Sequence, residues 1–580
     1  MARPLSPVPQ LSDGASPEWK LLLACARTRL DQAHRDRIRE LLQGPVDWNR
    51  FISAASRHRL DSLANRHLAV EAAGAIPAGA AITLETLVRS RGRHSLLHAG
   101  RLIELVDLFR SAGVAAVPYK GPTLGALAYG SFALRSFVDL DFILPQRDLL
   151  RAARLLTAQG FQAYPDPTAA EEARFLARFH PGQYAFVSPS KQLQVELHTE
   201  NTLRYLPVSL DWEGLGRRFI QVSFGGRQVQ TFSVEDTLIL LCVHGTKHFW
   251  ERLSWICDIA ELVQSPRGVD WELGQDLARR AGCRRMWLLG LSLANWLLDA
   301  PLPDNVLDWI AADFQVEGLR RQIQGRLAGE ERTVRSAPQR LLFRLRSHES
   351  LAVSLRQCLR TAMGPTEEDR HTFNLPDWAA PLYLALRPWR LLREHGFGLR
   401  GRPLPDLASF IPTPREAVEE LLRFAALGGG DVLYDLGCGD GRIVIAAARQ
   451  FGIRAVGIDV DPRRIAEARA NARRSGVEHL VEFRQQDVLE ADLAPATVVT
   501  LYLSDSGILA VSGKLREQLR PGARIISRDA AIPGWDPYST EEIFLGASKR
   551  TTTLFQWRIP QRAETLAQEV GTPSVVGRAG

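Results

Sequence analysis

Ten residues in the last third of the chain carry the pattern with the clearest chemical meaning. Residues 432–441 read VLYDLGCGDG, so a short β-branched and aromatic run ends in Asp435, and Gly437, Gly439 and Gly441 follow before a helical run. Glycines between a strand and a helix let backbone N–H groups come close to a ligand at the helix N-terminus. The pattern therefore predicts a nucleotide-like ligand at this loop.

Acids end each of the first three strands predicted for this region. Asp435 ends the first strand, Asp459 ends RAVGID at a spacing of 24 residues, and Asp487 follows VEFRQQ. The spacing predicts that Asp459 accepts hydrogen bonds from ribose hydroxyls and Asp487 from an adenine amino group. A NAD-type site is the alternative, but GCGDG lacks the GxGxxG spacing. Asp440 would also repel a pyrophosphate, whereas it suits an uncharged ribose and a cationic group.

A second group of acids lies nearer the middle of the chain. Asp139 and Asp141 stand two apart in a β-like run, which places both carboxylates on one face, and Glu196 lies in a separate run, LQVELH. Carboxylate oxygens are the ligands that Mg²⁺ prefers. Two acids on one strand and one on its neighbour could hold two Mg²⁺ around a triphosphate, where the metals clamp the attacking and leaving oxygens.

Two further sets of residues each allow two interpretations. His244 and His248 lie four apart on a predicted helix, a spacing that can bind zinc, but Gly245 follows the first histidine and there is no HExxH motif. Packed structural histidines are therefore favoured. Tyr502 lies in TLYL, within the buried strand predicted at 496–503. It lines either a ligand pocket or the core.

Length and composition indicate the class of protein that carries these sites. At 580 residues the chain exceeds the size of one hydrophobic core, and 45% hydrophobic residues are ordinary for globular domains. The net charge of +7 is spread thinly, which disfavours a nucleic-acid track. Six cysteines form no CxxC pair, which fits a reducing cytoplasm better than a disulfide or zinc scaffold. The N-terminus lacks a signal peptide, and the apolar run 286–298 is a core helix too short to span a membrane.

Hydrophobic periodicity divides the chain into two folded parts. Residues 18–397 are mostly helical, with alternating helix and strand signals in a core at about 95–200, and the Pro- and Gly-rich stretch 398–407 predicts a linker. Residues 408–562 alternate strands and helices, which predicts a parallel sheet with ligands at the strand carboxyl ends. The fold class is therefore α/β with two domains, a helix-rich α+β part and a doubly wound, Rossmann-like part. The predicted loose ends are residues 1–17 and 563–580.

The C-terminal motifs resemble class I S-adenosylmethionine (SAM)-dependent methyltransferases over about 410–559. The phrases FIPTP, VLYDLGCGDGRIVIAAA, AVGIDVDP, VVTLYL and LRPGARIISRD are most similar to small protein-lysine methyltransferases of the ATP-synthase-c and adenine-nucleotide-translocase type. The resemblance implies SAM as cofactor, with Tyr502 at the reaction centre. The sulfonium methyl group is already activated, so the protein has to align a nucleophile and exclude water. The expected cofactor-binding residues are Asp435, Gly437, Gly439, Asp440, Gly441, Asp459 and Asp487.

The central motifs resemble the nucleotidyltransferase superfamily, within it an uncharacterised bacterial family, over roughly 20–395. The order that carries the resemblance is K-G, then R-x-x-x-D-x-D, then E-L-H. It implies that Mg²⁺ and an NTP bind here and that Glu196 could also act as the base that activates the acceptor. The implied metal ligands are Asp139, Asp141 and Glu196, and the implied phosphate-binding residues are Lys120, Gly121 and Arg135.

The sequence departs from the superfamily at one point, because Lys120-Gly121 replaces the usual Gly-Ser pair of the phosphate loop. Catalysis by this domain and a degenerate binding role therefore both stay open. We expect a SAM-dependent methyltransferase fused to a Mg-dependent nucleotidyltransferase-like domain, acting on a small-molecule, peptide or protein methyl acceptor. In the alternative, only the methyltransferase is active and the N-terminal domain is a non-catalytic substrate-binding scaffold. Nucleic acid is disfavoured as a partner.

Overall fold

The computed structural model divides the chain into two compact units, Met1–Arg402 and Pro403–Gly580. The linker expected at 398–407, most of the N-terminal segment 1–17 and the tail 563–580 lie outside the described residues. The structure describes residues 15–72, 74–164, 183–188, 193–199, 211–327, 337–349, 413, 415–503, 505–532, 535, 537–545 and 550–560, together with the isolated positions 382 and 386.

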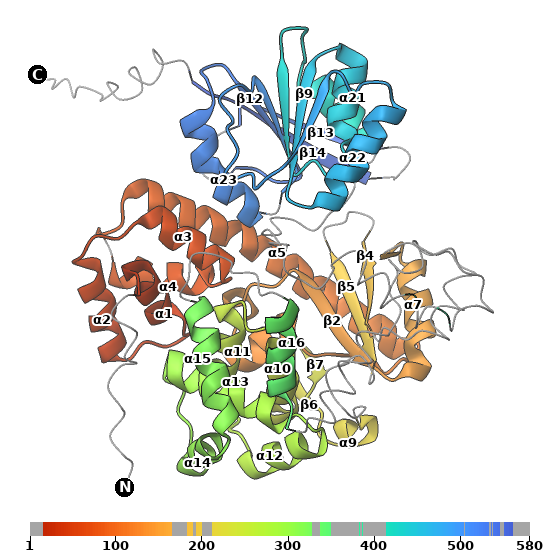
Figure 1. Cartoon of the computed structure of the whole chain (residues 1–580). Coiled ribbons are helices and arrows are strands. Elements are labelled where there is room, and N and C mark those ends of the chain that lie inside the picture. The colour runs from red at the N-terminus through yellow and green to blue at the C-terminus, as the bar shows by residue number, and fades with distance from the viewer. Residues whose placement is uncertain are drawn as a thin grey trace, which may run out of the picture. The chain divides into compact units, whose positions relative to one another are not determined.

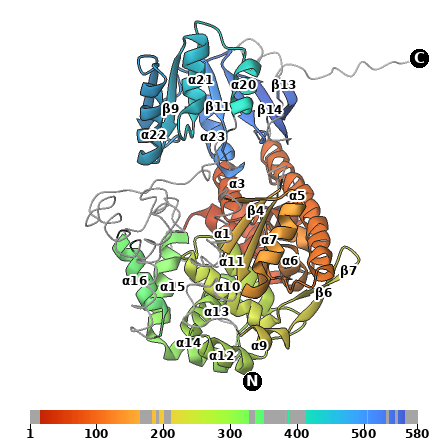
Figure 2. The same cartoon turned by 90° about the vertical axis from the view of Figure 1, so that its right-hand side faces the viewer.

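The first unit is helix-rich, as Figures 1 and 2 show. Several of its helices begin at a Ser or Asp whose side chain accepts a backbone N–H of the first turn, as Asp47 does for Arg50 (3.0 Å). No helix in the described ranges is both long and apolar enough to cross a bilayer. The helices are α1 (Pro17–Cys25), α2 (Gln32–Leu42), α3 (Trp48–Arg57), α4 (Asp61–Glu71), α5 (Ala78–Ser111), α6 (Gly121–Tyr129), α7 (Leu149–Ala158), α9 (Trp212–Gly216), α10 (Val234–Lys247), α11 (Leu253–Val263), α12 (Trp271–Arg280), α13 (Arg284–Leu298), α14 (Asp304–Ala312), α15 (Phe314–Leu327) and α16 (Ala337–Ser347), with 3₁₀ turns η1 (Phe132–Leu134) and η2 (Gln146–Asp148).

A five-stranded sheet lies among these helices in the order β1-β2-β5-β4-β3. Strands β2 and β5 are parallel and the other neighbouring pairs are antiparallel. Side chains alternate across the sheet, so Phe142 of β2 packs edge-on against Phe109 of α5, with ring centroids 5.3 Å apart, while Asp139 and Asp141 point to the opposite face. The strands are β1 (Val117–Pro118), β2 (Asp139–Leu144), β3 (Gln162–Tyr164), β4 (Gln183–Val187) and β5 (Gln194–Thr199), and a separate hairpin joins β6 (Ile220–Phe224) to β7 (Arg227–Thr231).

Helices α10, α11 and α13 form the helical core beside this sheet. The core helix expected at 286–298 is α13, and most of its side chains are buried. Trp250 is fully buried between helices where Gly245 leaves space for it, because a Cβ at position 245 would lie 2.5 Å from the indole ring. This close packing fixes the loop between α10 and α11, which carries Arg252.

The second unit is a three-layer α/β/α domain around a seven-stranded sheet of order β10-β9-β8-β11-β12-β14-β13. Its first five strands are parallel, and β14 and β13 add antiparallel edges. The helices and strands are α20 (Arg415–Phe424), β8 (Val432–Leu436), α21 (Arg442–Phe451), β9 (Arg454–Asp459), α22 (Pro462–Arg474), β10 (Val481–Gln485), β11 (Val498–Leu501), α23 (Asp505–Gln518), β12 (Arg524–Arg528), β13 (Ser539–Leu545) and β14 (Arg550–Arg558).

Two hydrophobic layers hold this sheet between its helices. Leu433 packs with α20, α21 and α22 on one face, and its neighbour Tyr434 packs with α23 on the other. The buried parallel strand expected at 496–503 is β11, with every residue buried. Strand order reverses between β8 and β11, and ligands of such sheets bind outside the strand carboxyl ends at this switch point. The predicted two-domain α/β layout is confirmed.

Candidate active sites

The acids of the first unit meet on one face of β2 and β5. Parallel pairing puts Asp139 beside Gln194 and Asp141 beside Glu196, with His198 one step further along β5. The side chains at 194, 196 and 198 share a face because strand residues alternate. The two strands thus bring together Asp141 and Glu196 of the three acids that the sequence proposes as metal ligands, while Asp139 lies on the same face beside Gln194 and outside the close group that Asp141 and Glu196 form with His198.

Asp141 is the most constrained of these acids, since its side chain is almost completely buried. Its Oδ1 lies 3.2 Å from Lys120 Nζ and 3.0 Å from His198 Nε2. Burial alone would raise the pKa of Asp141, but attraction to Lys120 and the hydrogen bond from His198 lower it well below its ordinary value. Asp141 is therefore a permanent anion at neutral pH.

The pKa of Asp139 shifts in the opposite direction to that of Asp141. Burial raises its pKa, and the negative charge of Asp141 raises it further, while Lys120 and Arg59 oppose this. Two carboxylates held close together disfavour double ionisation unless a cation joins them. This pair is therefore suited to a cation.

The residues fit a hard divalent cation. Ligand atoms of Asp141, Glu196 and His198 all lie within 4.8 Å of one another, the one such group of three found within the described ranges. Asp141 Oδ2 is buried and has no hydrogen-bond partner. His198 bonds both acids, at 3.0 Å to Asp141 and 3.4 Å to Glu196, and these bonds raise its pKa although burial alone would lower it. In its protonated form His198 would be a counter-charge rather than a ligand, and the donors of Asp141 and Glu196 are oxygens of the kind that Mg²⁺ and Mn²⁺ prefer.

The three residues that the sequence assigned to phosphates occupy different positions. Lys120 pairs with Asp141 and lies over the Tyr119 ring, 4.7 Å from its centroid. Gly121 begins α6 with φ 55°, and a Cβ added there would lie 3.5 Å from the Asp139 carbonyl oxygen. Arg135 donates its hydrogen bonds to a carboxylate other than those of β2.

Arg135 forms a buried two-point ion pair with Asp258 of α11. Its Nε and Nη2 donate to the two carboxylate oxygens at 2.7 and 2.9 Å, and Tyr129 Oη donates to the same carboxylate at 2.8 Å. Burial by itself would lower the pKa of Arg135, but attraction to Asp258 outweighs it and raises that pKa above its usual value. The ion pair joins η1 to α11, a role that the sequence pattern did not indicate.

His244 and His248 form an aromatic cluster on α10. Their rings lie 4.7 Å apart, and both contact Trp255 at 5.2 and 5.6 Å. Burial and nearby positive charges, Lys120 among them, lower the pKa of both histidines, so they are neutral. Within the described ranges they do not join a group of three metal-binding side chains.

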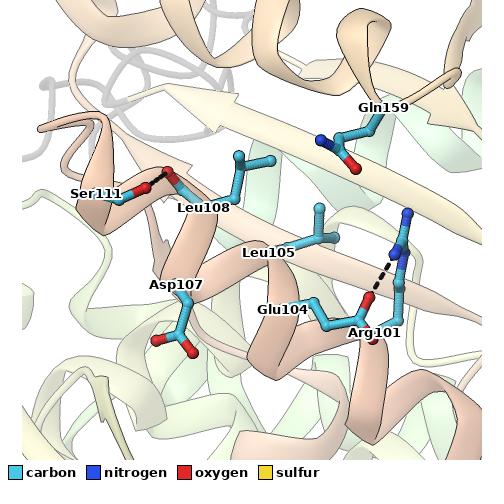
Figure 3. Close-up of a pocket in the computed structure, with 7 residues that line it drawn as sticks. All are labelled: Arg101, Glu104, Leu105, Asp107, Leu108, Ser111 and Gln159. Atoms are coloured by element: carbon cyan, nitrogen blue, oxygen red, sulfur yellow. Dashed lines mark hydrogen bonds and ion pairs between the residues drawn. The ribbon is translucent and has the colours of Figure 1, made fainter.

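A shallow hollow on the surface of this unit lies away from these residues (Figure 3). Six of its lining residues come from α5 and one follows α7, and Arg101 and Glu104 pair with each other inside it. It holds no residue of either predicted site. Its lining residues are Arg101, Glu104, Leu105, Asp107, Leu108, Ser111 and Gln159.

The second site lies at the carboxyl ends of β8 and β9. Asp435 is buried beside Thr500 of the neighbouring strand β11, whose hydroxyl donates to it at 2.7 Å. Burial raises the pKa of Asp435 to about 7, and the negative charges of Asp459 and Asp440 add to the rise against the lowering effect of Thr500. A buried acid that is only half ionised at neutral pH favours a cationic group beside it.

The glycine loop wraps around the end of β9. The Gly437 N–H donates to the Ile458 carbonyl at 2.9 Å, and the Gly439 N–H donates to Asp459 Oδ2 at 2.8 Å. Gly441 has φ 79°, and a Cβ there would lie 2.8 Å from the Phe483 ring, so only glycine fits. The loop thus places Asp459 directly beside the N-terminus of α21.

The other two acids are held in place by local bonds. Asp440 forms a multiple-contact ion pair with Arg442, with Nε at 2.9 Å from Oδ1, so its charge is already balanced within the loop. The sequence pattern placed this acid toward the ligand and did not foresee that partner. Asp487 follows β10 and accepts the Leu489 N–H at 2.9 Å, which leaves it half-exposed at the same edge of the sheet.

Tyr502 directly follows β11, and Arg528 of β12 lies over its ring with the guanidinium carbon 3.7 Å from the centroid. Arg528 is 1% exposed, and its three side-chain nitrogens have no hydrogen-bond partner. Asp529 Oδ2 lies 3.5 Å from Arg528 Nε and forms an ion pair with it. The sequence analysis missed Arg528, although the quoted phrase LRPGARIISRD contains it, just as the quoted ELH contains His198.

Two protein families match the chain in the regions just described. The family described as an uncharacterised nucleotidyltransferase matches residues 44–299, and the ANTKMT methyltransferase domain matches residues 435–539. The chain therefore combines a nucleotidyltransferase-like domain with a SAM-dependent methyltransferase domain, which confirms both predicted resemblances.

Several relatives are similar to the methyltransferase part of the chain. A protein-lysine N-methyltransferase of Saccharolobus islandicus is 37% identical over 147 residues, which are 25% of this chain and 91% of the relative. The adenine nucleotide translocase lysine N-methyltransferase of Mus musculus is 33% identical over 26% of this chain and 64% of the relative. The ATP-synthase-C lysine N-methyltransferase of Homo sapiens is 30% identical over 27% of this chain and 70% of the relative.

Solved structures also resemble this unit. An RNA methyltransferase from Salinibacter ruber in complex with S-adenosyl-L-homocysteine is 47% identical over 26% of this chain and 95% of that chain, with a TM-score of 0.25. Through its C-terminal domain the chain belongs to the family of small methyltransferases that includes the protein-lysine N-methyltransferase of Saccharolobus islandicus.

Proposed function

We propose that the protein transfers a methyl group from SAM to a lysine side chain of a protein. The similarity of the second unit to protein-lysine methyltransferases supports the acceptor class. The observation that carries the cofactor assignment is the bond from the Gly439 N–H to Asp459 (2.8 Å). It fixes a carboxylate beside the glycine loop at the switch point of the sheet, where a ribose would be bound.

Bound SAM supplies the electrophilic methyl group. In this proposal Asp459 accepts the ribose hydroxyls, Asp487 accepts the adenine amino group, and Asp435 faces the cationic methionine moiety. Tyr502 lines the acceptor side. A lysine reacts only as the neutral amine, and the cationic Arg528 under Tyr502 would favour that form, because a nearby positive charge lowers the pKa of an amine.

The test uses the full-length protein, isotopically labelled SAM and protein extract with and without nuclease treatment. Label on protein lysine, located by mass spectrometry, is the expected result. Label on RNA or DNA instead of protein would refute the acceptor assignment. Asp459→Ala should abolish SAM binding in calorimetry, whereas the exposed Glu478→Ala, which removes the same charge, should bind as the wild type does.

A second activity is proposed for the first unit, because Asp141 presents a buried, unpartnered carboxylate oxygen beside Glu196. In this proposal Asp139, Asp141 and Glu196 hold Mg²⁺, which would neutralise and orient the phosphates of an NTP. Glu196 could also accept the proton of the acceptor hydroxyl or amine. Lys120 and His198 keep Asp141 ionised, and this maintains the anionic character of the site.

Incubation with labelled ATP, CTP, GTP and UTP tests this second activity. Mg²⁺-dependent transfer to any acceptor, lost in Asp141→Asn, is the expected result. Absence of both transfer and Mg²⁺-dependent NTP binding would instead support a scaffold that recruits a substrate for the methyltransferase.

A further inference from the structure

The first site needs a positive group for the phosphates. The two residues predicted for that role, Lys120 and Arg135, are already paired with carboxylates of the protein. Lys120 is paired with Asp141, and Arg135 is held by both oxygens of Asp258. Binding of a triphosphate at this site rests on the proposed nucleotidyltransferase function. Such a ligand brings several negative charges beside three carboxylates, so another positive group is required there in addition to metal.

Arg59 occupies an unusual backbone position at the end of α3. Its φ is 57°, in the left-handed region, and the Arg59 N–H donates to Ser56 O at 3.1 Å while the Leu60 N–H donates to Ala55 O at 2.9 Å. This pair of bonds is the helix-ending motif in which glycine normally takes the left-handed residue. A non-glycine residue there is disfavoured by about 1–2 kcal/mol. The strain points to a role for the arginine side chain.

The turn that carries Arg59 is fixed against α11. The Leu253 N–H donates to Nδ1 of the buried His58 at 3.1 Å, and the Trp19 ring packs on His58 with centroids 5.3 Å apart. Because Arg252 directly precedes Leu253, this bond brings Arg59 and Arg252 toward one another. Arg252 in turn lies over the Trp255 ring at 5.5 Å, beside the histidines of α10.

The Arg59 side chain interacts electrostatically with Asp139 of β2. Asp139 and Arg59 stabilise each other's charged forms, so the two groups lie within electrostatic range. Burial lowers the pKa of Arg59 to about 9, and repulsion from Arg252, Arg91 and Arg135 contributes to the decrease. No side chain in the described ranges forms a hydrogen bond or an ion pair with the Arg59 guanidinium. Arg91, in contrast, is committed to Asp61 and Ser56.

We propose that Arg59 is the phosphate-binding residue of the first site, and that its guanidinium binds the non-transferred phosphates of a metal-bound NTP. Its geometry suits this role, because Arg59 lies on a strained turn that His58 anchors to α11, and its unpaired guanidinium is within electrostatic range of Asp139. An arginine offers a planar donor pair that matches phosphate oxygens. Binding of phosphate would also relieve the repulsion among the surrounding arginines.

Calorimetric titration of the full-length protein with Mg-ATP and with inorganic triphosphate tests the proposal. Arg59→Gln should weaken both by about 10- to 100-fold, the range for loss of a charge-assisted hydrogen-bond pair. Mn²⁺ binding measured alone should be retained in this variant. Arg66→Gln removes an exposed arginine from the adjacent helix α4 and should leave both affinities at the wild-type value.

A second variant separates a binding role from a structural one. Arg59→Gly removes the left-handed strain, so it should raise the thermal midpoint of unfolding. The same variant should lose the triphosphate affinity that the Arg59 side chain contributes. If Arg59→Gln and Arg59→Gly bind triphosphate as well as the wild type, the assignment to Arg59 is wrong while the nucleotidyltransferase proposal stands. If the wild type itself binds neither Mg-ATP nor triphosphate, both are wrong.

Discussion

Asp435 offers the sharpest test of the second site, because the same carboxylate should destabilise the fold and assist cofactor binding. The residue is 3% exposed at the end of β8, accepts one hydrogen bond from Thr500 and lies in the field of Asp459 and Asp440. Asp435→Asn keeps the shape and an oxygen acceptor for Thr500, and it removes the ionisable group.

The expected magnitude follows from the pKa of this carboxyl, which burial raises from 3.8 to about 7 in the folded protein. The folded protein then holds this proton more tightly than the unfolded chain, so stability is full below pH 4 and falls as the pH rises toward 7. A rise of this size in the pKa of Asp435 lowers the free energy of unfolding by on the order of 4 kcal/mol once the carboxyl is ionised. Asp435→Asn should recover much of it at pH 8, roughly 10 °C in the thermal midpoint of this domain.

Calorimetric scans of the full-length variant and wild type between pH 4 and pH 8 measure this difference, following the transition that S-adenosylhomocysteine shifts in the wild type. The gain should be near zero at pH 4 and largest at pH 8, and SAM affinity should fall in the variant. Asp431→Asn is the control of opposite sign. Burial alone would raise the pKa of Asp431, but its bonds with Arg524, Gly428 and Thr497 lower it, so its removal should destabilise the domain at pH 8. A variant Asp435→Asn that is equally stable at all pH values would refute the argument.

Three further changes probe the other contacts. Asp459→Ala should abolish SAM binding without loss of the folded domain, as judged by calorimetry and circular dichroism. Tyr502→Phe should retain the stacking on Arg528 and the stability, whereas Tyr502→Ala should cost about 1–2 kcal/mol in denaturant unfolding. A methyl-transfer rate that is unchanged in Tyr502→Ala would assign this tyrosine to the core. Asp258→Asn leaves Arg135 buried with a weakened partner and should destabilise the first unit by about 3 kcal/mol or more in urea unfolding, and a neutral effect would contradict the structural role given to this pair.

The sequence pattern placed the elements of the second unit well. The strand that carries Asp435, the strand that ends in Asp459 and the helix from Pro462 appear where the hydrophobic pattern and the glycines predict them. Local signals suffice there because each strand, turn and helix is contiguous in sequence. The pattern could not foresee that Asp440 is neutralised by Arg442, since that depends on which rotamers the loop allows.

The first unit shows the limit of such reasoning. The spacing of Asp139 and Asp141 gave their shared face, but their distance from Glu196 depends on the parallel pairing of β2 with β5. Arg135 seemed available for phosphate until the structure paired it with Asp258, 123 residues away. No motif in the sequence marks Arg59, because its position relative to Asp139 depends on a helix end that is anchored on α11.

The sequence by itself determined the two domain classes and the cofactor class of the second, and it proposed the acids of both sites. These follow from periodicity and from motifs within short stretches, where covalent connection already fixes the geometry. Only the tertiary structure decided which charges are compensated and which stay available. That depends on burial and on partners distant in sequence, and both arise only when helices and strands pack together.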